Sequence, residues 1–79
     1  MSVVADQLAE IFRLVLDLPP DAEVTQLRRV ATPKWDSLAN ATLVTALESE
    51  FRITLDARET DRLTSYKAAL LLLEEKSSR

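Results

Sequence analysis

The sequence predicts an all-α protein, a small four-helix bundle with three main helices and one short helix. Apolar residues recur at three- and four-residue steps in three separate stretches, which is the period of one helical face. The three prolines lie between the first two stretches, and the chain has no glycine, so hairpins and glycine turns are disfavoured. We expect the 79 residues to form one domain, residues 1–79.

Residues 3–18 are predicted to form the first helix, with Ser2 as its N-cap. Pro19 and Pro20 end it, because the residue before a proline is pushed out of the α region. Its buried face is expected to comprise Val4, Leu8, Ile11, Phe12 and Val15.

Residues 19–35 are predicted to form a long connection, with one helical turn around residues 22–27. Val24, Leu27 and Val30 are its expected anchors in the core, and Arg28 and Arg29 are expected to be solvated loop charges. Trp35 is expected to lie over one end of the bundle.

Residues 36–51 form the clearest predicted helix. Asp36 and Ser37 are both of residue types that cap a helix N-terminus. The core stripe is expected to comprise Leu43, Leu47 and Phe51, with Glu50 at its boundary.

The remaining chain predicts a short helix at 57–62 and a last helix that ends near Lys76. Ile53 and Leu55 are expected to point inward before the short helix, and Thr64 or Ser65 to cap the last one. The buried face of the last helix is expected to comprise Tyr66, Ala69, Leu70 and Leu73. The leucine run 70–73 indicates core residues plus one exposed edge rather than a dimer seam.

Composition narrows the function classes. Without cysteine or histidine the chain has no thiolate or imidazole to act as nucleophile, general base or metal ligand, so we expect no enzyme. The net charge of −3 disfavours binding to nucleic acid or to anionic membranes. No apolar run approaches the ~20 residues of a membrane span and no signal peptide is apparent, which predicts a cytoplasmic protein, expected to be a monomer.

The helix at 36–51 has a second, partly apolar face opposite its core stripe. This face comprises Leu38, Ala41, Val44, Thr45 and Glu48, and Ser37 lies beside it. The helix holds three acids and no base, whereas the rest of the chain holds 10 of each sign. A partner with a basic surface would therefore be steered toward it.

Ser37 stands where a phosphate ester would be stabilised by the N–H groups and dipole of the helix start. The chain supplies no suitable base for this hydroxyl, so another enzyme would have to provide the base and the metal. Considered alone, Ser37 is also explained as an N-cap or the neighbour of one.

The residues around Ser37 resemble the attachment motif and second helix of acyl carrier proteins. The resemblance rests on Trp35-Asp36-Ser37-Leu38 and on the segments 43–44, 46–48, 50–51 and Ile53, and the order of helices and loops extends it over the whole chain. It implies the four-helix fold of that family. It also implies that a phosphopantetheinyl transferase, using coenzyme A and magnesium, attaches a 4′-phosphopantetheine arm to Ser37.

The resemblance further implies that the arm carries acyl or aminoacyl groups between acyl-loading and acyl-processing enzymes. Those enzymes would dock on Leu38, Ala41, Val44 and Glu48, and Asp36 would cap the helix or help the transferase bind. Family members of fatty-acid synthesis usually carry acids where this chain has Ala39 and Thr42, and glycines at the positions of Lys34-Trp35 and Arg52. These departures favour a specialised pathway, such as polyketide, modified-acyl or aminoacyl assembly.

Two other classes stay open. The chain is also compatible with an unmodified adaptor whose Leu38 face binds a partner helix. A helix-turn-helix DNA binder ranks behind both, because the acidic segment 36–51 would repel phosphate.

Overall fold

Four α-helices and one 3-10 helix make up the regular structure of residues 3–77, the part of the chain that the computed structural model describes. In chain order these are α1 (Val3–Val15), η1 (Arg29–Ala31), α2 (Ser37–Phe51), α3 (Ala57–Asp61) and α4 (Tyr66–Ser77). The predicted all-α bundle with three main helices and one short helix is therefore confirmed. None of the helices in residues 3–77 is long and apolar enough to cross a membrane.

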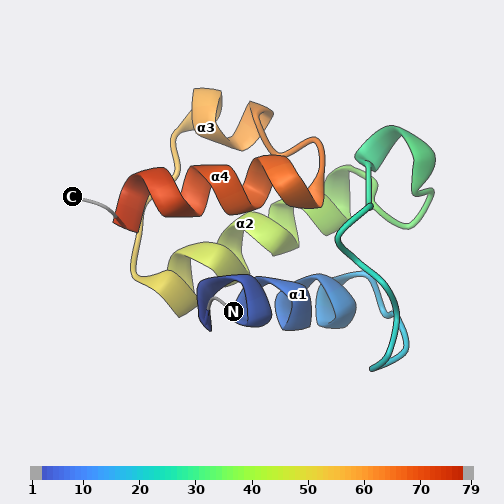
Figure 1. The fold of residues 1–79 in the computed structure, drawn as a ribbon. Helices are drawn as coiled ribbons and strands as arrows, with labels where there is room; N and C mark the ends of the chain where they lie inside the picture. Colours follow the sequence, from blue (N-terminus) through green and yellow to red (C-terminus); the bar gives the residue numbers. More distant parts are fainter. Residues whose placement is uncertain (1–2, 78–79) are drawn as a thin grey trace.

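The helices are arranged around α1, which contacts both α2 and α4. Figure 1 shows that α2 and α4 both begin at the end of the bundle where the long connection lies, and that α1 runs the opposite way. The short helix α3 lies on the side of α4 that faces away from α1 (Figure 1). We call the end where α2 and α4 begin the loop end, and the opposite end the α3 end.

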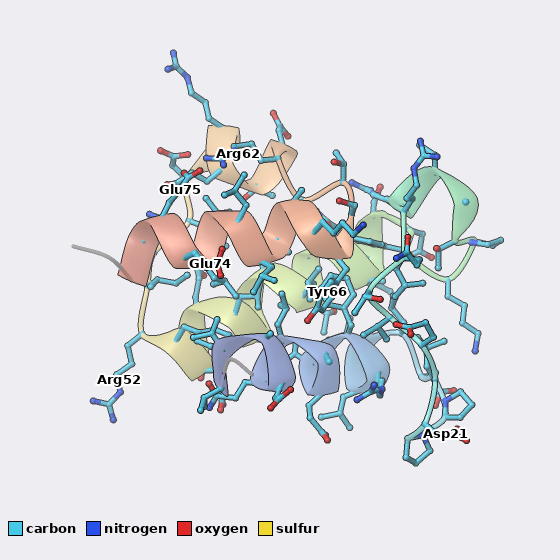
Figure 2. All side chains as sticks on the ribbon, in the orientation of Figure 1. Asp21, Arg52, Arg62, Tyr66, Glu74 and Glu75 are labelled. Carbon is cyan, nitrogen blue, oxygen red and sulfur yellow. The ribbon has the colours of Figure 1, made fainter. Side chains whose placement is uncertain are left out.

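The core is built from one apolar stripe on each long helix and from single residues of the loops. Its buried members are Leu8, Ile11, Phe12, Leu16, Val24, Trp35, Leu43, Leu47, Leu55, Leu63, Tyr66, Ala69, Leu72 and Leu73. The Phe12 ring packs edge-on against Trp35, with ring centroids 5.0 Å apart, and lies 5.6 Å from the Tyr66 ring. Burial raises the pKa of the Tyr66 phenol, whose hydroxyl donates to the Ala5 carbonyl at 2.9 Å (Figure 2).

The helix starts follow the predicted caps. The Asp36 side chain accepts from the N–H of Ala39, and the Ser65 hydroxyl accepts from that of Ala68, so Ser65 rather than Thr64 caps α4. Asp56 and Glu59 form a capping box at the start of α3. The predicted N-cap Ser2 lies outside the described residues.

The first helix ends earlier than predicted. α1 stops at Val15, not at residue 18, because Asp17 adopts a left-handed conformation with φ 55°. The N–H of Leu18 then donates to the Arg13 carbonyl at 2.8 Å, a pattern that closes a helix C-terminus. Leu16, just past the helix, is buried instead of Val15, which is half-buried.

The long connection differs most from the prediction. Its helical turn is η1 at residues 29–31 instead of the expected 22–27. Val24 is buried and Leu27 packs against the core as predicted, but Val30 is 85% exposed. Backbone hydrogen bonds from Arg29 N to Thr64 O and from Tyr66 N to Leu27 O attach this segment to the start of α4. Those partners lie 35 and 39 residues away in the sequence, so local pattern could not predict them.

Smaller differences concern single residues on α2 and α4. Phe51 is half-buried, and Glu50 is exposed rather than at the boundary of the core. On α4, Leu72 is buried where Leu70 was predicted. Leu71 is exposed, so the predicted single exposed edge of the leucine run is confirmed.

Candidate functional site

Ser37 is the first residue of α2 and its side chain is exposed. The residue before it, Asp36, has extended backbone geometry and caps the helix through its Oδ1 atom, 2.8 Å from the Ala39 nitrogen. Ser37 is therefore the neighbour of the cap and not the cap itself. Its hydroxyl forms no hydrogen bond with any residue of the described chain, 3–77, so the Oγ atom is accessible for reaction.

The start of α2 can stabilise a phosphate and offers the Ser37 hydroxyl no imidazole or thiolate. The N–H groups of Ser37 and Leu38 have no acceptor within the helix, and the helix dipole favours negative charge here. The chain has no histidine or cysteine to take the Ser37 proton.

Trp35 fixes the position of the chain just before Ser37. Its indole is 2% exposed, and its Nε1 atom donates to Asn40 Oδ1 at 2.9 Å. Together with the Phe12 ring contact, this bond holds the loop against the first turns of α2. Trp35 covers the loop end of the core, as predicted.

Asn40 is the residue that sequence reasoning missed. It is buried on the side of α2 that also carries Leu43 and Leu47. The available signal was the spacing: a polar residue three positions before Leu43 and seven before Leu47 belongs to the same helical face. A polar side chain on a buried face needs a hydrogen-bond partner, and Trp35 is a nearby donor.

The predicted docking residues divide into two groups. Leu38 is 77% exposed and Ala41 is exposed, so the part of the face nearest Ser37 is accessible. Leu38 belongs neither to the core nor to the partly buried apolar residues packed against it.

Val44 and Glu48 are partly taken up by the fold. Val44 is half-buried and packs against the core. The Glu48 carboxylate accepts from the Leu55 N–H at 2.8 Å, which attaches the segment after α2 to the helix. Glu48 therefore has a structural role besides the docking role predicted for it.

Basic residues precede the serine in the loop. Arg29 Nε donates to the Trp35 carbonyl at 3.3 Å, and Lys34 Nζ donates to the Asp17 carbonyl at 3.1 Å. Both acceptors are neutral, and no carboxylate of residues 3–77 lies within ion-pair distance of Arg28, Arg29 or Lys34. Residues 25–38 hold three cations and one anion, Asp36, which gives a local charge of +2.

The acidic residues of the long connection lie in its first half. They are Asp17, Asp21 and Glu23. Figure 2 shows Asp21 at the tip of the loop beyond α1, on the side away from α4. Hydrogen bonds from the Thr25 side chain and backbone lower the pKa of the Glu23 carboxyl, so that carboxylate is already engaged locally.

Residues 3–77 contain no group of three or more acidic side chains arranged to hold a metal ion. Neither a protein-family model nor a curated protein matches the chain.

Proposed function

We propose that this protein is an acyl carrier that bears a 4′-phosphopantetheine arm on Ser37 and is not itself an enzyme. The observation that carries the proposal is the position of Ser37. Its hydroxyl is exposed, forms no hydrogen bond within the described chain, and sits at a helix start that favours phosphate.

Attachment is a phosphoryl transfer performed by a phosphopantetheinyl transferase. The Ser37 Oγ atom attacks the phosphorus of coenzyme A that bears pantetheine, and a new oxygen–phosphorus bond forms. The diphosphate bond breaks, adenosine 3′,5′-bisphosphate leaves, and the serine proton passes to a base of the transferase. The carrier contributes the placed hydroxyl and the helix N-terminus, and the transferase contributes magnesium and the base.

The arm then carries the cargo as a thioester. The bound group supplies the reactive thiol, and the protein supplies position and recognition. Ala39 and Thr42 stand on α2 where acids are usual in carriers of fatty-acid synthesis, which supports a dedicated carrier of a specialised acyl or aminoacyl pathway in the cytoplasm. Docking should be weak and transient, because the carrier must leave each enzyme.

Intact-mass spectrometry tests the proposal. The full chain is incubated with coenzyme A, magnesium and a broad-specificity phosphopantetheinyl transferase. We expect a gain of one phosphopantetheinyl group on the parent and on Ser49→Ala, an exposed serine of the same helix, and none on Ser37→Ala. Lack of any gain with two different active transferases and a folded chain would contradict the proposal.

Glu48 requires a variant that separates charge from structure. Glu48→Gln removes the charge but keeps an oxygen that can accept from the Leu55 N–H, whereas Glu48→Lys removes both. If Glu48 also docks the transferase, Glu48→Gln should slow modification while leaving the melting temperature unchanged. An unchanged rate would remove Glu48 from the docking surface.

The second candidate is an unmodified adaptor. It is favoured by the two large apolar side chains, Val30 and Leu38, that are exposed on either side of Trp35. An adaptor would lose partner binding in Leu38→Ser and would gain no mass with any transferase.

A further inference from the structure

We propose that the loop end docks an acidic protein surface with an apolar centre, in place of the basic partner that the acids of the helix at 36–51 predict. This docking inference depends on the proposed carrier function only in assuming that partner proteins approach Ser37. It names the chemistry of those partners. The docking surface consists of the exposed side chains of Arg28, Val30, Lys34 and Leu38, and we call it the basic rim.

The basic rim is one folded unit. The Thr32 hydroxyl donates to the Arg28 carbonyl at 2.7 Å, the Trp35 N–H donates to the Thr32 carbonyl at 2.9 Å, and Arg29 Nε donates to the Trp35 carbonyl. These bonds fold residues 28–35 back on themselves directly before α2. The cations and Val30 therefore precede Ser37, and Leu38 follows it, within a short, fixed segment.

The segment 25–38, which holds the basic rim, is positively charged although the whole chain carries −3. Residues 25–38 carry +2, and their only acid, Asp36, is engaged in capping α2. α2 and α4 both begin at the loop end (Figure 1), and each helix start adds partial positive charge. The two acids within α2 are Glu48 and Glu50. Both lie in its last turns, toward the α3 end.

A groove beside the basic rim adds a further cation. Its walls are residues 25–28 on one side and Ser65 and Lys67 at the start of α4 on the other. Arg28 and Lys67 thus face the same hollow from two chain segments, and both side chains are exposed. A carboxylate of a partner that entered the groove would lie between two cations.

The exposed apolar residues separate a protein partner from a nucleic acid. Val30 and Leu38 are 85% and 77% exposed, and they would gain from burial in a partner's apolar pocket, whereas a phosphate backbone offers none. A few cations on a chain of net −3 are also a weak polyanion site. Charge and apolar exposure together therefore favour an acidic protein surface.

Two synthetic peptides test the proposal. One is an amphipathic helix with a leucine face flanked by glutamates, and the other is its twin with lysine at every glutamate. Each is titrated into the ¹⁵N-labelled full chain while amide shifts are followed. We expect the acidic peptide to shift amides of residues 28–38 and 65–67, and to bind at least about tenfold more tightly than the lysine twin.

Matched variants locate the interaction. Arg28→Glu combined with Lys34→Glu should weaken the acidic peptide about tenfold, and Val30→Ser should weaken it without changing its salt dependence. Arg58→Glu combined with Arg62→Gln, at the α3 end, should leave binding unchanged. The Trp35 emission reports that each variant is folded. Arg28→Gln serves as a second test if the double variant does not fold.

Several results would overturn the proposal: equal or tighter binding of the lysine twin, shifts confined to another surface, or equal weakening by the α3-end variants. Tighter binding of a single-stranded oligouridine than of the acidic peptide would also overturn it and assign the rim to nucleic acid. Ser37→Ala keeps the basic rim and should bind the peptide normally. Failure of the peptide test and failure of the mass test are therefore distinguishable.

Discussion

The loop end and the α3 end of the molecule differ in how their cations are paired. At the α3 end, Arg62 forms a two-bond ion pair with Glu75, and Lys76 lies 2.8 Å from Glu59 (Figure 2). At the loop end, Arg28, Arg29 and Lys34 have no carboxylate of residues 3–77 within ion-pair distance. Two cations of the α3 end, Arg62 and Lys76, are thus paired within the fold. Arg52 and Arg58 at the same end, like the three cations of the loop segment, form no ion pair with residues 3–77.

Large apolar side chains are exposed in several parts of residues 3–77, namely Val3 and Leu14 on α1, Leu71 on α4, and Val30 and Leu38. The loop end leaves Val30 and Leu38 in solvent beside Ser37, while the segment between α2 and α3 buries Leu55. Exposed apolar groups and unmatched cations both cost stability or solubility in isolation. Their coincidence at the end that bears Ser37 is the basis on which we propose a docking role for this end.

The largest change in the free energy of unfolding should come from a substitution in the core, which joins the two ends. Leu47 is fully buried on α2, so Leu47→Ala should lower the free energy of unfolding by about 2–5 kcal/mol. Leu38→Ala, on the same helix but exposed, should change it by less than about 0.5 kcal/mol. Urea titrations followed by circular dichroism measure both. Similar losses in the two variants would erase the distinction between core and docking face.

The next largest loss of stability should come from breaking the hydrogen bond that holds the loop end together. Asn40→Ala leaves the buried Trp35 Nε1–H without its acceptor, which should cost about 1–3 kcal/mol. Ser49→Ala, an exposed change on the same helix, is the control. Trp35 fluorescence follows the unfolding. A loss no greater than that of the control would mean that the loop end is held by apolar packing alone.

A smaller change in the free energy of unfolding, a gain in stability, is expected at the α3 end. Arg52 ends α2 with φ 54° and ψ 50°, a conformation that glycine adopts without steric cost, and its side chain projects into solvent (Figure 2). Arg52→Gly should therefore stabilise the fold by about 0.5–1 kcal/mol. Arg52→Ala keeps the Cβ atom and should bring no such gain. Differential scanning calorimetry distinguishes the two.

The smallest effect tests the charge comparison directly. Arg62→Ala should lower the melting temperature slightly at low salt, because it removes an exposed two-bond ion pair, and high salt should abolish the difference. Hydrogen bonding to Glu75 raises the pKa of the Arg62 guanidinium. Arg28→Ala should leave the melting temperature unchanged at either salt. A loss in Arg28→Ala would show that the basic rim serves stability.

The helices, their caps and most of the core followed from the sequence, because these features depend on near neighbours. Periodicity identified Leu8, Phe12, Leu43 and Leu47 as core residues, and residue type identified Asp36 as a cap. The exposed position of Leu38 follows from the same helix, since Leu38 lies on the side opposite the core stripe, and Ser37 lies beside that face.

Only the tertiary structure decided the course of the long connection and the role of its residues. The turn at η1 depends on hydrogen bonds to Thr64 and Tyr66, which bring together segments far apart in the sequence and leave Val30 in solvent. Likewise, the contact of Glu48 with the Leu55 N–H and that of Asn40 with Trp35 required the packed chain. Local pattern determines which face of a helix is buried, but where a loop folds back and which charges find partners depends on distant neighbours.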